Sequence, residues 1–249
     1  MFVAASSRCF PDVAQETCID KLADLEYTAY EVVIGNRKSD LNPDILLGSL
    51  EQAAKLCCSN RQIRPISFFL DLEGTDPHYF EVFDACCRLS KFLRIVSITV
   101  KSGILGTPYN EEIERLRRLT KAAMFDGITV GILNESGKIA GTAESIQSLC
   151  KSVSHLALTL DPSYFIFNQP NPVDYDSLIP LTSHVRLRDT TREKFQVLLG
   201  QGILEYGKLV IQLSKVKYNR ALCVDLHPLP DVNQETELRK MRLLLESIL

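Results

Sequence analysis

Eight short apolar segments recur along the chain, and this repetition limits the possible fold more than any other feature of the sequence. Their starts lie 28 to 37 residues apart, and a stretch with helical periodicity fills most of the gaps. Strands that alternate with helices in this way are typical of a (β/α)8 barrel. The predicted strands are Phe2–Ser7, Tyr30–Gly35, Ile66–Leu72, Ile95–Val100, Ile128–Leu133, Leu156–Asp161, His184–Asp189 and Ala221–Leu226.

The character of these segments indicates parallel strands. Most are continuous apolar runs, as expected for strands that are buried on both faces. A doubly wound α/β sheet is the alternative, but such sheets often carry a glycine-rich loop after the first strand, and Ser6–Phe10 contains no glycine. The length of 249 residues suits one barrel, and no linker-like tract divides the chain. We therefore predict the α/β class, with a single TIM-barrel domain spanning residues 1–249.

Helical spacing of apolar residues predicts the elements between the strands. One segment differs, because residues 168–180 contain three prolines and leave room only for a short helix around Tyr175–Ile179. We expect this segment to form a lid or a contact loop near the mouth of the barrel. The predicted helices are Pro11–Leu25, Pro43–Cys58, Asp76–Leu89, Tyr109–Phe125, Thr142–Val153, Glu205–Val216 and Gln234–Ile248.

Composition narrows the classes of function. The formal net charge is −3 and the basic residues are scattered, which argues against general nucleic-acid binding. No apolar run approaches the roughly 20 residues of a membrane span, and the chain starts without a leader-like segment. None of the eight cysteines has C-x-x-C spacing, so we expect reduced, mostly buried thiols. These features predict a cytoplasmic protein; self-association into a homo-oligomer stays open.

Polar side chains at the strand ends are the candidate site residues, because active sites of such barrels lie at the carboxyl ends of the strands. These residues are Glu31, Asp71, Glu73, Lys101, Asn134, Glu135, Asp161, Arg186, Arg188, Asp189, Asp225 and His227.

Three segments carry a resemblance to a known family: His184–Asp189, Gly200–Leu209 and Leu213–Asp225. With them the chain resembles the xylose-isomerase-like (β/α)8 superfamily, which contains sugar phosphate isomerases and epimerases. It also contains the endonuclease-IV type of DNA repair enzymes (AP endonuclease family 2). That branch needs three metals and many histidine ligands, whereas this chain has four histidines and a negative net charge, which argues against DNA cleavage.

The resemblance implies a divalent cation such as Mn²⁺ or Mg²⁺ at the barrel mouth. Its usual ligands are a Glu, an Asp, a His and a Glu on strands five to eight. In this sequence those positions fall on Leu133, Asp161, Arg186 and Asp225. An arginine cannot ligate a metal, so the pattern predicts no metal cofactor and a degenerate metal site. A register shift in the fifth strand that turns Glu135 inward is the alternative, since it would restore a weak site.

We hypothesise that the guanidinium of Arg186 takes the place of the metal and pairs with Asp161 and Asp225, because two converging buried carboxylates need a counter-cation. Arg188 either helps to hold an anion or points outward from the end of its strand. The turn Gly200-Gln201-Gly202 either brings backbone N–H groups to a phosphate or is an ordinary turn before a helix.

The expected function is that of a sugar phosphate isomerase/epimerase-like protein. It would act on, or bind, a small carbohydrate or its phosphate without the usual metal. The alternative is a non-catalytic TIM-barrel protein that binds a small ligand or a protein partner. We expect Glu31, Asp161 and Asp225 to transfer protons. The expected substrate-binding residues are Lys101, Asn134, Glu135, Arg186, Asp189 and His227.

Overall fold

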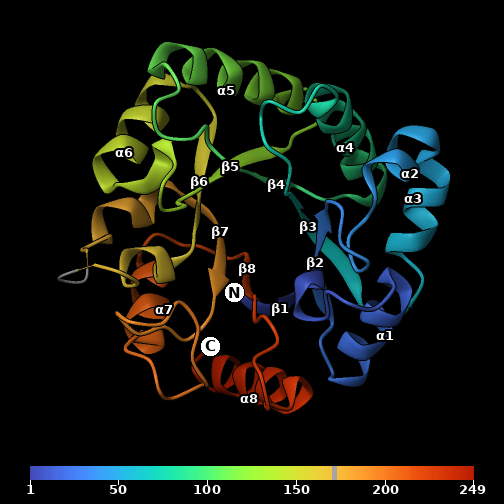
Figure 1. Cartoon of the computed structure of the whole chain (residues 1–249), viewed down its shortest axis with the longest axis vertical. Helices are drawn as coiled ribbons and strands as arrows, with labels where there is room; N and C mark the ends of the chain where they lie inside the picture. The colour runs from blue at the N-terminus through green and yellow to red at the C-terminus, as the bar shows by residue number, and fades with distance from the viewer. Residues whose placement is uncertain (170–172) are drawn as a thin grey trace.

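A closed barrel of parallel strands forms the centre of the molecule (Figure 1). The structure, a computed structural model, describes residues 1–169 and 173–249. Each strand pairs with the next in chain order, and the last pairs with the first. This confirms the predicted (β/α)8 barrel and excludes the doubly wound sheet. The strands are β1 Phe2–Ser6, β2 Ala29–Ile34, β3 Arg64–Leu70, β4 Ser97–Val100, β5 Thr129–Leu133, β6 Leu156–Leu160, β7 Thr182–Leu187 and β8 Ala221–Val224.

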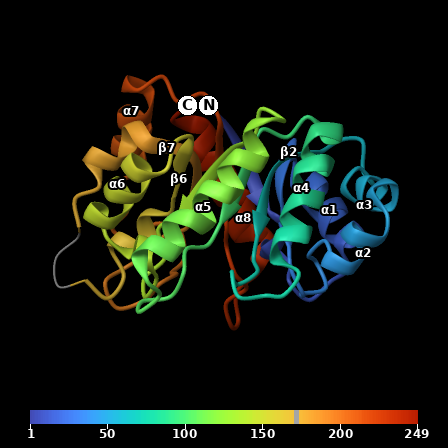
Figure 2. The same ribbon diagram turned by 90° about the horizontal axis from the view of Figure 1, so that it is seen from above.

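A ring of helices surrounds the barrel, and a view turned by 90° shows them standing along its sides (Figure 2). Four short 3-10 helices also lie in the described ranges: η1 Ser7–Cys9, η2 Ile139–Gly141, η3 Pro162–Phe165 and η4 Asp176–Leu181. The α-helices are α1 Gln15–Asp24, α2 Pro43–Gly48, α3 Leu50–Cys57, α4 Tyr79–Leu93, α5 Tyr109–Met124, α6 Ala143–Ser152, α7 Tyr206–Lys215 and α8 Gln234–Ser247.

The single helix predicted over Pro43–Cys58 is wrong in one respect, because it is two helices. Ser49 separates them: its backbone is extended, with φ −155° and ψ 109°, and its hydroxyl accepts a hydrogen bond from the Gln52 N–H. A serine that caps the next helix stabilises a break that apolar periodicity alone does not reveal.

The segment rich in prolines is described only in part. A 3-10 helix, η4, occupies Asp176–Leu181, close to the short helix predicted there. Residues 170–172 lie outside the described residues, so the expected lid or contact loop stays a prediction.

The interior of the barrel is unusually polar at its middle level. Side chains alternate along a strand, so His184 and Arg186 on β7 both point inward, and both are buried. Thr99 and Thr159 share a hydrogen bond of 2.8 Å beside them. On β5, a Cβ atom at Gly131 would collide with the Thr159 hydroxyl, so glycine leaves space for this polar layer.

Two further sequence predictions concern the cysteine thiols and membrane-spanning helices. All eight cysteines are free thiols, as predicted. Among the described helices, none is long and apolar enough to cross a membrane.

Candidate functional site

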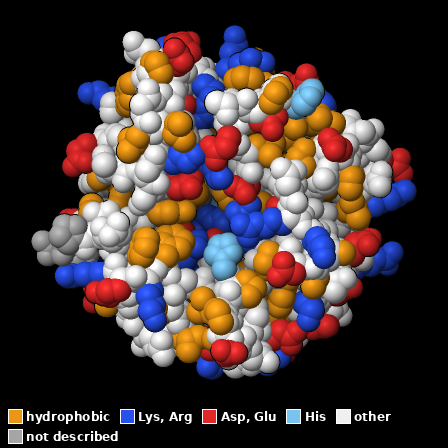
Figure 3. Space-filling model, viewed as in Figure 1, with side chains coloured by type: hydrophobic (Ala, Val, Ile, Leu, Met, Phe, Trp, Pro, Cys, Tyr) orange, Lys and Arg blue, Asp and Glu red, His pale blue; other side chains and the backbone are white. Residues whose placement is uncertain are grey.

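A cavity of about 250 Å³ opens at the carboxyl ends of the strands, and we call it the mouth cavity. The face seen in Figure 3 is hollowed near the barrel axis, with Lys and Arg side chains gathered around the hollow. Five cations line the cavity: Arg8, Arg37, Lys101, Arg186 and Arg188. The carboxylates in its lining are Asp71, Glu135, Asp161 and Asp225.

Two arginines of β7 and the residues after it cross-link the carboxylates. Arg186 donates from Nη1 to Glu31 Oε1 at 2.6 Å and from Nη2 to Asp225 Oδ2 at 2.7 Å. Arg188 donates from Nη2 to Asp161 Oδ2 at 2.8 Å and to Asp225 Oδ2 at 2.5 Å. These five side chains form a continuous buried ion-pair network, which we call the arginine network.

The network corrects two sequence expectations. Arg186 pairs with Asp225 as expected, but its second partner is Glu31, and Asp161 is held by Arg188 instead. Arg188 does not point outward, since it is buried. The physical reason is strand alternation, which puts residues 184, 186 and 188 on the same inner side, with Arg186 one level deeper than Arg188.

The charges in the network stabilise one another. Burial alone would raise the pKa of Glu31, but Arg186 and His184 outweigh it and hold the pKa below its ordinary value. Burial opposes ionisation of Asp225 in the same way, yet Arg186 and Arg188 hold the pKa of this carboxyl well below its usual range. Both carboxylates are therefore ionised at neutral pH and are weak proton acceptors.

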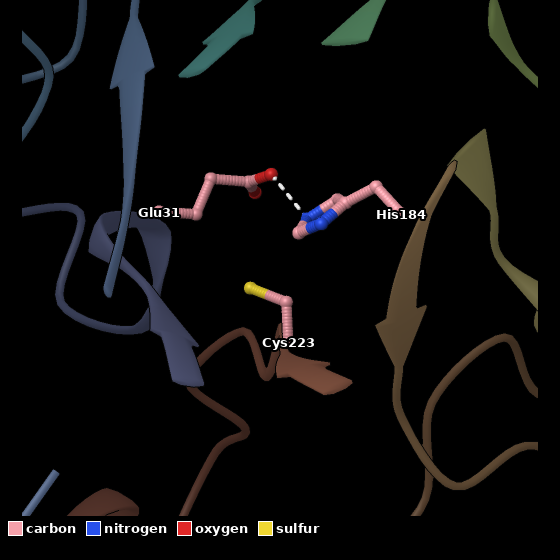
Figure 4. A group of neighbouring side chains, drawn as sticks. All are labelled: Glu31, His184 and Cys223. Atoms are coloured by element: carbon pink, nitrogen blue, oxygen red, sulfur yellow. Dashed lines mark ion pairs between the residues drawn. The ribbon is translucent and has the colours of Figure 1, made fainter. Parts of the chain in front are cut away.

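Glu31 lies deeper than the sequence suggested, inside the barrel rather than at the mouth. Its Oε2 atom is 2.8 Å from Nε2 of His184, and Cys223 approaches the same pair from β8 (Figure 4). Sequence reasoning overlooked His184, although its spacing of two residues from Arg186 places both on one face. Burial raises the pKa of the Cys223 thiol well above its ordinary value, so the sulfur stays protonated.

Among the described residues, two sets of side chains have the chemistry of metal ligands, and in each set an arginine already pairs with a carboxylate. Asp161 and Asp225 share the Nη2 atom of Arg188, which bridges their Oδ2 atoms. Glu31, His184 and Cys223 place ligand atoms within 4.8 Å of one another, but Arg186 already binds Glu31. A divalent cation at either place would have to compete with a fixed positive charge for these carboxylates.

Two residues expected to bind substrate hold the backbone instead. The Asn134 side chain donates to the Asp161 carbonyl at 2.9 Å and accepts from its N–H at 2.7 Å, which ties β5 to β6. Asp189 accepts from the N–H groups of Gly200 and Gly202 at 2.7 and 3.0 Å. The two amides of this turn therefore bind the carboxylate of Asp189 and not an external phosphate. Neither Asn134 nor Asp189 lines the mouth cavity.

Three other expected binding residues do meet at the mouth: Lys101, Glu135 and His227. Lys101 is paired with Asp71, with Nζ 2.5 Å from Oδ1. Glu135 lines the mouth cavity although β5 pairs with β4 and β6 without the register shift of the alternative, and its buried Oε2 has no hydrogen-bond partner among the described residues. Burial lowers the pKa of His227, so its ring is neutral at pH 7. Glu135 and His227 are thus cavity groups that the arginine network leaves available.

Sequence reasoning also missed Arg8, which follows β1 and lines the mouth cavity. Arg8 forms an ion pair with Asp71, and burial together with Arg186 lowers its pKa to about 10. The strand-end rule that selected the other candidates could have found it. Aromatic rings complete the site: Arg186 lies over Phe69, 4.3 Å from the ring centroid, and Arg188 lies over Phe195 at 4.5 Å.

Comparison with known proteins supports the fold and leaves the activity open. No protein-family model matches the chain, and no curated protein sequence matches it. Solved structures do match over nearly the whole chain. A D-tagatose 3-epimerase-like protein is 16% identical, with a TM-score of 0.73 and 99% of each chain covered.

Two further structures agree. The 3-keto-D-glucoside 4-epimerase of E. coli is 12% identical, with a TM-score of 0.76 and 99% of each chain covered. A xylose isomerase-like TIM barrel protein from Mycobacterium smegmatis, solved in complex with magnesium, is also 12% identical. Its TM-score is 0.79, with 99% of this chain and 97% of that one covered. The chain thus has the xylose isomerase-like barrel fold that the sequence resemblance implied.

Proposed function

We propose that the mouth cavity binds a small carbohydrate or sugar phosphate without a divalent metal, and that the protein acts on it as an isomerase or epimerase. The observation that supports this proposal is the arginine network: two guanidinium groups pair with the buried carboxylates at the strand positions from which the family resemblance would draw metal ligands. Solved structures of sugar epimerases with the same fold support the carbohydrate class.

The charges of the cavity favour an anionic ligand. Five cations and four carboxylates line it, and Arg186 and Arg188 are already paired with carboxylates of the arginine network. Arg37 is exposed, and its side chain makes no ion pair with the residues that the structure describes. A guanidinium binds phosphate or carboxylate oxygens in a bidentate way, so Arg37 is suited to the anionic end of a sugar phosphate.

Isomerase chemistry needs a base that removes a proton next to a carbonyl group, and cations that stabilise the resulting enediolate. Glu31, Asp161 and Asp225, the expected bases, are each held by an arginine. We therefore assign proton transfer to Glu135, whose Oε2 is unpartnered among the described residues, with neutral His227 as the second group. Arg188 and Lys101 would stabilise the enediolate oxygens.

A second candidate is a non-catalytic carbohydrate-binding protein. The engagement of Glu31, Asp161 and Asp225 in ion pairs favours it, because a network that satisfies its own charges is stable without substrate. Under this alternative the mouth binds the same ligands but moves no proton.

One experiment separates these candidates. Chelator-treated protein is titrated calorimetrically with a panel of aldose and ketose phosphates, and bound ligands are incubated in D2O and followed by proton NMR. We expect binding without added metal and deuterium uptake at the carbon beside the carbonyl. Binding without deuterium uptake supports the non-catalytic candidate, and binding that needs Mn²⁺, or no binding, contradicts the proposal.

Matched variants make the test specific. Arg37→Glu should weaken binding by at least about tenfold, since the anion loses its cation. Arg61→Glu makes the same charge change at an exposed residue outside the cavity and should leave binding unchanged. Glu135→Gln should abolish deuterium uptake while sugar phosphate binding is retained.

A further inference from the structure

A second cavity, of about 430 Å³, opens at the opposite end of the barrel, and we call it the floor cavity. Its lining includes Phe2 and Ala221, where β1 and β8 begin, and Ser97 at the start of β4. The floor and mouth cavities share no lining residue. The proposed function places no ligand here.

The described lining of the floor cavity contains three arginines and no carboxylate, together with the imidazole of His184, which pairs with Glu31 inside the barrel. Arg64 and Arg94 are exposed, and their side chains form no ion pair within the described ranges. Among the described residues, Arg220 donates to two neutral groups, the Ser183 carbonyl at 3.5 Å and the Thr129 hydroxyl at 3.4 Å. Without a carboxylate in the lining, these three positive charges favour an anion in the cavity.

The walls between these arginines are largely apolar. Phe2, Ile66, Leu93, Val96 and Ala221 supply hydrocarbon surface to the cavity. An inorganic anion would leave this surface in contact with water, whereas a ligand with an apolar body would cover it. A cavity of about 430 Å³ also falls within the usual size of small-molecule sites.

A buried hydroxyl group, that of Ser97, lines the floor cavity. Ser97 is only 3% exposed, and its Oγ has no hydrogen-bond partner among the described residues. It lies two residues before Thr99, whose hydroxyl meets Thr159 inside the barrel, so Ser97 also faces inward. Buried hydroxyl groups are normally paired, and an oxygen of a bound ligand would satisfy this one.

From these observations we propose that the floor cavity is a binding site for an amphipathic organic carboxylate. The arginines attract the carboxylate group, the apolar walls cover its hydrocarbon body, and the Ser97 hydroxyl offers a hydrogen bond. This inference is independent of the proposed function, since it uses no residue of the mouth cavity.

Octanoate is the probe that tests the site, with octanol and acetate as matched controls. Octanol has the same chain without charge, and acetate has the charge without the chain. Using ¹⁵N-labelled full-length protein, we expect octanoate to shift the amide signals of Ser97, Ser183 and Ala221 at a lower concentration than either control. Shifts confined to the mouth residues, equal affinity for octanol, or no shifts would overturn the proposal.

Charge reversal at Arg64 and Arg94, the exposed arginines of the floor cavity, provides a second test of the proposal. The variant Arg64→Glu/Arg94→Glu changes two exposed residues and should weaken octanoate binding at least about tenfold. The variant Arg61→Glu/Arg239→Glu makes the same total charge change at exposed residues outside the cavity and should bind octanoate normally. Equal weakening in both variants would show a general charge effect and refute a specific site.

Discussion

Arg186 on β7 reaches Glu31 on β2 through the inside of the barrel, with Nη1 2.6 Å from Oε1. The side chains of both residues are almost fully buried, at 2% and 0% exposure. Taking two charges out of water is costly, and the cost is offset only where their contacts are complete. The stability of the barrel centre therefore depends on each of these two buried charges keeping its partner.

Replacing this cation should strongly destabilise the protein. Arg186→Met leaves Glu31 and Asp225 without their shared partner, and we expect the free energy of unfolding to fall by about 3–5 kcal/mol. Urea denaturation followed by circular dichroism measures it. The double variant Arg186→Met/Glu31→Gln should be less destabilised than the single one, because one uncompensated charge is removed.

A surface pair gives the matched control. Arg117 and Glu114 form an exposed ion pair on α5, so Arg117→Met should cost less than about 1 kcal/mol. If the two single variants lose equal stability, the interior pair has no special energetic role.

Acid should weaken the fold in a defined pH range. The pKa of Glu31 and Asp225 lies below the ordinary values of 4.5 and 3.8, so below about pH 4.5 the unfolded chain binds more protons than the folded one. The stability from these groups is complete above that pH and is lost as the pH falls. Denaturation at a series of pH values should show this decline, and Asp225→Asn should make it shallower.

His78 and His227 should titrate in a fixed order. Burial lowers the pKa of His227 below 6.5, whereas the hydrogen bond to Glu81 raises that of exposed His78 above it. Two-dimensional NMR of the imidazole signals should therefore show His78 gaining its proton at a higher pH than His227. The reverse order would contradict the buried, neutral His227 that we assign to the mouth.

Removing one arginine should create a metal site. In Arg188→Gln, Asp161 and Asp225 lose the nitrogen that they share, and with Glu135 they offer carboxylate oxygens that suit Mn²⁺. We expect this variant to bind Mn²⁺ at least about tenfold more tightly than the wild type. Arg117→Gln, on the outer surface, should not change Mn²⁺ affinity.

The barrel was predictable from the sequence because its strands stand out as short, continuous apolar segments. Continuous apolar runs, such as Leu156–Asp161, are what parallel strands buried on both faces require. The break between α2 and α3 was not predictable from periodicity, since Ser49 acts through a single capping hydrogen bond.

The residues of the site were predictable in part, but their contacts were not. Strand ends indicated Lys101, Glu135 and His227, and all three line the mouth cavity. Of the two partners of Arg186, Asp225 was predicted but Glu31 was not, because a strand position fixes the side of a residue and not how deep its long side chain reaches. The backbone roles of Asn134 and Asp189 depend on loop geometry that spacing does not encode.

Titration of the chelator-treated wild-type protein with Mn²⁺, followed by electron paramagnetic resonance, tests most directly the claim that arginines replace the metal. The account predicts that the signal of free Mn²⁺ grows in proportion to added metal, with no stoichiometric binding. Tight binding of one Mn²⁺ per chain that Asp161→Asn abolishes would contradict it.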